Sequence, residues 1–146
     1  MAERVINAYK YPSKHIVYQV QPATTALTAL KTKKGDCTEY AMMFVAICRA
    51  MGIPSRVISL FNFKKRTKFS NPNHNEAEIY IPKLGWMPIY SNLGQGSENN
   101  EYSPGSISDT NIVYSYNVWT WSNYMPNTKH LKGQIKQKTT WKVSEI

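Results

Sequence analysis

Residues 35–56 read GDCTEYAMMFVAICRAMGIPSR, and this stretch decides the fold. Its apolar residues recur every three or four positions, which is the period of one buried face of a helix. Asp36 is a good N-terminal cap, and Glu39 three residues later completes a capping box. Gly52 suits the left-handed turn that ends many helices, and Pro54 prevents the helix from continuing. We therefore expect one capped helix between these two signals.

Cys37 directly follows the cap and should lie in the first turn of this helix. Unpaired backbone N–H groups and the helix dipole favour negative charge there, so a thiol at this position is biased toward the thiolate. A thiolate is a strong nucleophile, and it works with a base. His74 is the candidate base, because it begins an alternating segment downstream. The competing interpretation is that Cys37 is a small buried core residue, as free cysteines often are.

Two blocks of this sequence form a recognisable pair of motifs. The first consists of Gly35-Asp36-Cys37, Glu39, Ala41, Arg49-Ala50 and Gly52-Ile53-Pro54-Ser55-Arg56, and the second of His74-x-x-x-Glu78-Ile79-Tyr80-Ile81-Pro82 and Gly85-Trp86-x-Pro88. Together they resemble the transglutaminase-like superfamily, which has the papain-like cysteine fold, and they come in the order of that family and span roughly residues 25–92. The resemblance implies acyl transfer at a cysteine, with Cys37 as the nucleophile and His74 as the general base.

The same resemblance implies a third catalytic member, an aspartate on the strand after the Gly-Trp turn. An ungapped match places Tyr90 at that position. Asn92 lies two residues further on the same strand face, and an amide serves in related Cys-His-Asn enzymes. Glu76 is charged and shares the His74 side of its strand, where the family usually has an aromatic residue. As the group that orients the histidine ring, we rank Tyr90 first by position, Asn92 second and Glu76 third.

The 146 residues are enough for one domain with a substantial core. We expect a single transglutaminase-like α+β domain over residues 1–146, in which the cysteine-bearing helix packs against an antiparallel β-sheet. The motif core covers about 25–92, a long loop rich in Gly, Ser and Asn covers 93–110, and C-terminal strands cover 111–146.

Local patterns predict the remaining elements. A short helix is expected at residues 2–10, because Tyr11-Pro12 should break it, and a second helix at 26–31. Strand-like segments are 15–20, 57–63, 74–82, 86–90, 111–121 and a last one within 131–143, and a polar loop is expected over 64–73.

The net charge of +9 arises from clusters of basic residues at 31–34, 64–68 and 129–138. Such clusters usually form solvated faces, and no nucleic-acid-binding motif accompanies them, so no specific nucleic-acid partner is expected. No apolar run approaches the roughly 20 residues of a membrane span. The first residues show no signal peptide, so the cytoplasm is the default expectation, and export would need a leader outside this sequence. The oligomeric state is left open.

The two cysteines, Cys37 and Cys48, lie on one predicted helix. The helical rise separates them by about 16 Å, which is too far for a disulfide, so both should be free thiols. Two Cys and three His show no metal-ligand spacing, so no metal is expected. The implied chemistry requires no cofactor.

These observations favour cysteine-dependent acyl transfer on an amide bond of a peptide or protein. The expected form is peptidase- or amidase-type hydrolysis through a thioester. The alternative is a catalytically impaired domain of the same fold that binds a peptide or protein, and Tyr90 in place of aspartate motivates it.

Overall fold

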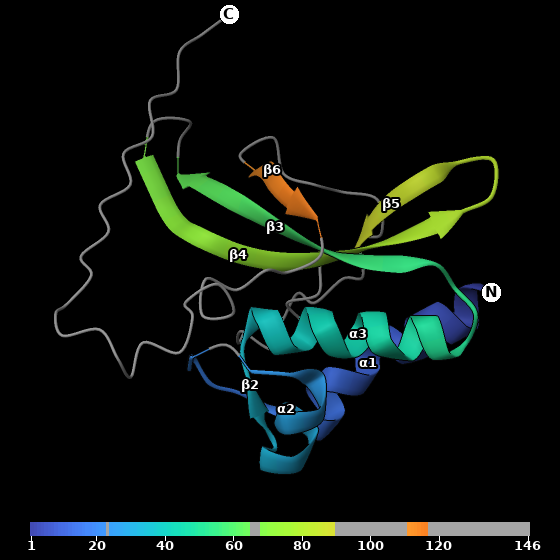
Figure 1. Ribbon diagram of the computed structural model, residues 1–146, viewed down its shortest axis with the longest axis horizontal. Helices are drawn as coiled ribbons and strands as arrows, with labels where there is room; N and C mark the ends of the chain where they lie inside the picture. The colour runs from blue at the N-terminus through green and yellow to red at the C-terminus, as the bar shows by residue number, and fades with distance from the viewer. Residues whose placement is uncertain (23, 65–67, 90–110, 117–146) are drawn as a thin grey trace, which may run out of the picture.

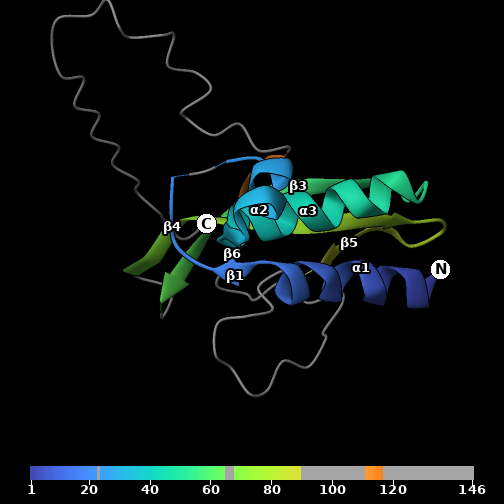
Figure 2. The ribbon, with the colours of Figure 1, turned by 90° about the horizontal axis from the view of Figure 1, so that it is seen from below.

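The computed structural model describes residues 1–22, 24–64, 68–89 and 111–116. Helix α3 lies at the centre, with a sheet along one side and α2 on the other, and α1 runs beside it (Figures 1 and 2). This is the mixed helix and antiparallel-sheet architecture that the sequence predicts. The elements are α1 Ala2–His15, β1 Val17–Tyr18, α2 Ala26–Thr32, β2 Lys34–Gly35, α3 Cys37–Ala50, β3 Ser55–Lys64, β4 Lys68–Ile81, β5 Gly85–Ile89 and β6 Asn111–Tyr116.

Helix α3 begins and ends where its capping residues predict. The Asp36 carboxylate accepts a hydrogen bond from the Thr38 N–H at 3.0 Å, and the Glu39 carboxylate accepts one from the Asp36 N–H at 2.9 Å. At the other end Gly52 has a φ of 74°, and the Ile53 N–H donates back to the Cys48 carbonyl at 2.9 Å. These local bonds satisfy groups that a helix end leaves unpaired, so they fix both ends of α3.

The larger sheet has the strand order β5-β4-β3-β6, and each neighbouring pair is antiparallel. Strand β3 is central, as its apolar residues on both faces predict: Val57, Ile58 and Leu60 are all buried. Among the described strands β5 lies at one edge of the sheet, a position where a proline such as Pro88 is tolerated. The short strands β1 and β2 form a separate parallel pair next to the start of α3.

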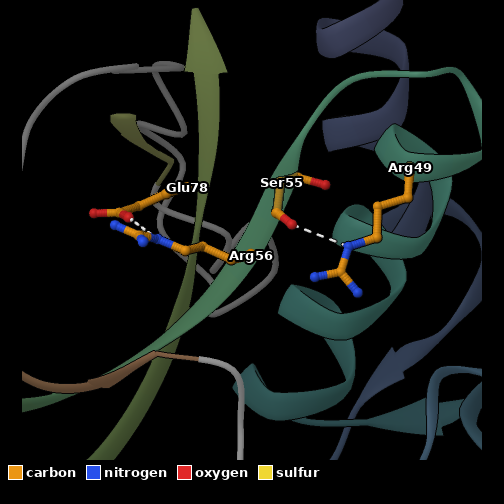
Figure 3. Close-up of polar contacts among 4 residues, drawn as sticks. All are labelled: Arg49, Ser55, Arg56 and Glu78. Carbon is orange, nitrogen blue, oxygen red and sulfur yellow. Dashed lines mark hydrogen bonds and ion pairs between the residues drawn. The ribbon is translucent and has the colours of Figure 1, made fainter. Parts of the chain in front are cut away.

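The two faces of β3 have different surroundings (Figure 3). Ser55 faces α3, because its hydroxyl donates to the Val45 carbonyl at 3.2 Å, and Arg49 of α3 donates to the Ser55 carbonyl at 3.0 Å. Arg56 points to the opposite face, where its Nε lies 2.7 Å from Glu78. The face toward α3 closes the main core, whose buried members are Val5, Ala8, Tyr9, Ala41, Phe44, Val45, Cys48, Ile53, Val57, Ala77, Ile79 and Ile89.

The predicted break at Tyr11-Pro12 is wrong, because α1 continues through Pro12 to His15. A proline inside a helix lacks the N–H that would bond to the carbonyl four residues earlier. Pro12 is buried, and its carbonyl still accepts from the Ile16 N–H at 2.8 Å. Burial of the proline and the bond that closes the last turn offset the missing bond. Because α1 extends to His15, the strand expected over 15–20 is shorter than predicted and consists only of β1, Val17–Tyr18.

The polar loop predicted over 64–73 is also wrong, because β4 already begins at Lys68 and pairs with β3. Pairing shifts from Asn62↔Asn71 to Leu60↔His74, so β4 carries one more residue than β3 between these pairs. Such a bulge admits a proline, which cannot donate to a regular ladder, and the segment includes Pro72. Of the other predictions, the 93–110 loop, the 131–143 strand and the residues of the 111–121 strand after Tyr116 lie outside the described residues.

Candidate active site

Cys37 is the first residue of α3, and only 6% of its surface is exposed. The capping box uses the N–H groups on both sides of it, those of Asp36 and Thr38. The Cys37 N–H itself has no hydrogen-bond partner among the residues that the structure describes. In the described structure, the first turn of α3 therefore places the Cys37 thiol next to a backbone N–H that is free to donate, as expected at the start of a helix.

His74 lies on β4 directly after the bulge, and it is 6% exposed. Its side chain is hydrogen-bonded to that of Cys37. Its Nε2 lies 3.3 Å from Oε1 of Glu76, two residues further along the strand. The structure thus brings together three of the side chains that the sequence singled out.

The surroundings of His74 stabilise its protonated form. Burial alone lowers the pKa of His74, because it removes water from the imidazolium. The hydrogen bonds and charges of Cys37 and Glu76 act in the opposite direction and more than offset this effect. Together they raise the pKa to about 9. At neutral pH His74 is therefore an imidazolium that lies between a sulfur and a carboxylate.

Glu76 is fully buried, at 0% exposure. Within residues 1–22, 24–64, 68–89 and 111–116, neither of its carboxylate oxygens has a hydrogen-bond partner of good geometry, and its one close charged contact there is with His74. A buried carboxylate with so few partners is unfavourable unless a nearby positive charge compensates it. The 3.3 Å contact is long for a hydrogen bond, and its strength comes from the charge on both groups.

Tyr90 and Asn92, the first- and second-ranked candidates for the orienting group, lie outside the described residues, and their roles stay predictions. Glu76, ranked third, is the candidate that the structure places beside His74. In the described part of the chain, no three His, Cys, Asp or Glu side chains gather as metal ligands do. No helix found there is long and apolar enough to cross a membrane.

Sequence reasoning missed a second polar cluster beside the first. Asn75, the residue after His74, contacts Thr38 on α3 and Ser59 on β3, and all three side chains are buried. One signal was available in the sequence. The alternation that places Ala77 and Ile79 on a buried face also places Asn75 there. A polar residue at such a position needs a buried partner.

Comparison with known proteins identifies the family. Residues 1–91 match the model of the Transglutaminase-like superfamily, which is well over half of the chain, and the chain therefore belongs to that superfamily. An uncharacterized protein from Haemophilus influenzae is 30% identical over 107 residues. That alignment covers 60% of this chain and 29% of the relative, so this chain spans less than a third of the relative's length.

Two solved structures are similar in fold. A candidate cysteine protease from Cytophaga hutchinsonii superposes with a TM-score of 0.52 at 19% identity, over 81% of this chain and 43% of that one. A structure described as a TGase gives 0.49 at 16% identity, over 69% and 29% of the two chains. The first supports the papain/transglutaminase-like fold. Family and fold together support a cysteine-dependent kind of enzyme.

Proposed function

We propose that this chain is a cysteine-dependent amide hydrolase of the peptidase or amidase type, which cleaves a peptide or protein amide through a thioester. The observation that carries the proposal is the placement of Cys37 at the start of α3 against the protonated ring of His74. A thiolate beside an imidazolium provides a nucleophile and a proton donor in one pair. Membership of the transglutaminase-like superfamily supports the same chemistry.

In the first half of the proposed reaction, Sγ of Cys37 attacks the amide carbonyl carbon and forms a C–S bond. The carbonyl oxygen becomes negatively charged, and the unused Cys37 N–H is placed to donate to it. Collapse of this intermediate breaks the C–N bond, and His74 gives its proton to the leaving amine. The products of this half are the free amine and a thioester on Cys37.

In the second half, neutral His74 takes a proton from a water molecule as that water attacks the thioester carbonyl. The C–S bond breaks, the carboxylic acid leaves, and the thiolate of Cys37 and the imidazolium of His74 are restored. A second amine in place of water would give acyl transfer instead of hydrolysis. Hydrolysis is our proposal by analogy with the candidate cysteine protease whose fold is similar.

Within the same proposal, Glu76 is the group that orients the His74 ring. Its carboxylate lies 3.3 Å from Nε2, it is fully buried, and the described residues give it no other hydrogen-bond partner. A carboxylate at Nε2 holds the ring beside the sulfur, and it stabilises the imidazolium between the two half-reactions. The resemblance implies an aspartate and an aromatic residue where this chain has Tyr90 and Glu76. Glu76 would thus supply the missing carboxylate from the neighbouring position.

Alkylation by iodoacetamide tests whether Cys37 is activated. We expect Cys37 to alkylate at pH 6 at least about tenfold faster than free cysteine, because it lies at a helix start against the side chain of His74. The measurement is the second-order rate constant for each cysteine between pH 5 and 9, read by mass spectrometry of the two cysteine-containing peptides. Cys48 is the internal control in the same sample.

A Cys37 that alkylates no faster than free cysteine below pH 8 would contradict the proposal. That result would favour the alternative, a domain of this fold that binds a peptide or protein without catalysis. Turnover is then measured on a mixed library of peptide amides, with the His74→Ala variant as the comparison. Cleavage that persists in His74→Ala would remove His74 from the proposed mechanism.

A further inference from the structure

Asn75 links the two segments that carry the proposed catalytic pair. Its Nδ2 donates to the Thr38 hydroxyl at 2.8 Å, and its Oδ1 accepts from the Ser59 hydroxyl at 2.7 Å. Thr38 directly follows Cys37 on α3, and Asn75 directly follows His74 on β4. We refer to Thr38, Asn75 and Ser59 as the polar bridge.

The polar bridge is buried and its hydrogen bonds are short. Asn75 is 9% exposed, and Thr38 and Ser59 are each 6% exposed. Ser59 is also the direct register partner of Asn75 across the β3–β4 ladder, so the bridge begins at a fixed point in the sheet. In such a low-dielectric setting an amide that is bonded at both its nitrogen and its oxygen is held firmly, because any displacement leaves a buried polar group unpaired.

The rest of the contact between α3 and the sheet is mainly apolar. Phe44 and Val45 of α3 pack in one core with Val57 and Ile79 of the sheet. Apolar burial is non-directional, so it holds the helix on the sheet without setting one position along it. Near the end of α3, Arg49 and Val45 also bond to Ser55 of β3. At the cysteine end, the directional bonds of the polar bridge fix the helix, one residue away from each of the two reacting side chains.

We infer that Asn75 is a positioning residue: by joining Thr38 to Ser59, it sets the position of the α3 start on the sheet and so holds Cys37 against His74. This inference rests on the proposed function, because it assumes that the pair reacts. A misplacement of about 1 Å in such a pair can reduce the rate by up to about 100-fold. The polar bridge therefore acts through Cys37 and His74, not on the substrate.

The test compares Thr38→Val, which removes the hydroxyl but keeps the shape, with Thr38→Ser, which keeps the hydroxyl. Asn75→Ala removes the bridging amide itself. The readout is the rate constant for alkylation of Cys37 by iodoacetamide from pH 5 to 9, together with the melting temperature. Thr32→Val, the same change at an exposed position of α2, is the control.

We expect Thr38→Val and Asn75→Ala to reduce the alkylation rate constant at pH 6 by about tenfold or more, and to move the pH profile toward that of free cysteine. Thr38→Ser should restore the rate to within about threefold of the original, and Thr32→Val should not change it. A lower melting temperature with an unchanged pH profile would mean a structural bond only, and it would overturn the inference.

The two proposals fail in different ways. If Cys37 of the original chain already reacts like free cysteine, the proposed function fails before any variant is measured. If the original chain is reactive and the bridge variants match it, only the positioning inference fails. If Thr38→Val does not fold, Asn75→Ala decides, because it removes the amide that Thr38→Val leaves unpaired and takes a partner only from the Thr38 and Ser59 hydroxyls.

Discussion

The two ends of α3 each carry a cysteine, and their surroundings differ completely. Cys37 at the start lies beside the His74 ring and an unused backbone donor. Cys48 near the end is fully buried in the main core, and burial raises its pKa to about 11. At neutral pH only about one Cys48 thiol in 10⁴ is ionised.

The comparison shows that the position of a thiol, not its presence, sets its chemistry. The start of a helix collects unpaired N–H groups and positive dipole, while the apolar core penalises any charge. A single helix can therefore hold a nucleophile at one end and an inert packing residue at the other. The capping box bonds the N–H groups on either side of Cys37, and within the described residues the Cys37 N–H has no partner, which is part of this difference.

The largest expected effect separates the two cysteines by activity. Cys37→Ala should reduce peptide-amide hydrolysis by at least about 10³-fold, because it removes the nucleophile, with little change in melting temperature. Cys48→Ala should leave turnover within about twofold and reduce the free energy of unfolding by about 1 kcal/mol, since it opens a small cavity in the core. The measurements are turnover on a peptide-amide library and urea denaturation. Equal losses of activity in the two variants would contradict the assignment of Cys37 as the nucleophile and Cys48 as a packing residue.

The charged end of the helix should also give the protein a pH-dependent stability. The pKa of His74 is raised from 6.5 to about 9 in the folded protein. The resulting stabilisation is fully present below pH 6.5 and is lost as the pH rises through about 9. The His74 contribution to the free energy of unfolding should therefore fall by about 3 kcal/mol over that range. Urea denaturation at pH 6, 7.5 and 9 measures it.

Glu76→Gln sharpens this prediction, because the carboxylate is one of the groups that raise the pKa of His74. The fall in stability should still begin near pH 6.5, but it should be smaller and be complete at a lower pH. The alkaline limb of any hydrolytic activity should move down by roughly one pH unit. Glu78→Gln is the matched control, since Glu78 pairs with Arg56 instead. If Glu78→Gln shifts the profile as much as Glu76→Gln does, Glu76 is not the orienting group.

The smallest expected effects concern the glycines that flank α3. A Cβ on Gly35 would lie 2.6 Å from the Cβ of Glu39, inside the capping box, so Gly35→Ala should reduce the free energy of unfolding by about 2 kcal/mol. A Cβ on Gly52 would meet nothing within 4 Å. The cost of Gly52→Ala therefore comes from the positive φ alone, and this variant should reduce the free energy of unfolding by about 1 kcal/mol. Urea denaturation of both variants measures the two losses in the free energy of unfolding. A larger loss for Gly52→Ala than for Gly35→Ala would contradict the expectation.

Sequence reasoning succeeded where the decisive interactions are local. The capping box joins residues three apart, and the turn at Gly52 joins Ile53 to Cys48. It failed at Pro12 and over 64–73, where a proline and a run of polar residues suggested breaks. There, burial of Pro12 and pairing of β4 with β3 outweighed the local preference.

The sequence by itself determined where α3 begins and ends, and which thiol lies at its start, because hydrogen bonds between near neighbours depend little on the rest of the fold. Only the tertiary structure decided that the third-ranked Glu76 lies against His74, and that Asn75 joins Thr38 to Ser59. Thr38 and Asn75 are 37 residues apart in the chain. Their meeting depends on the register and bulge of β4, which the pairing of whole strands sets and no short stretch of sequence encodes.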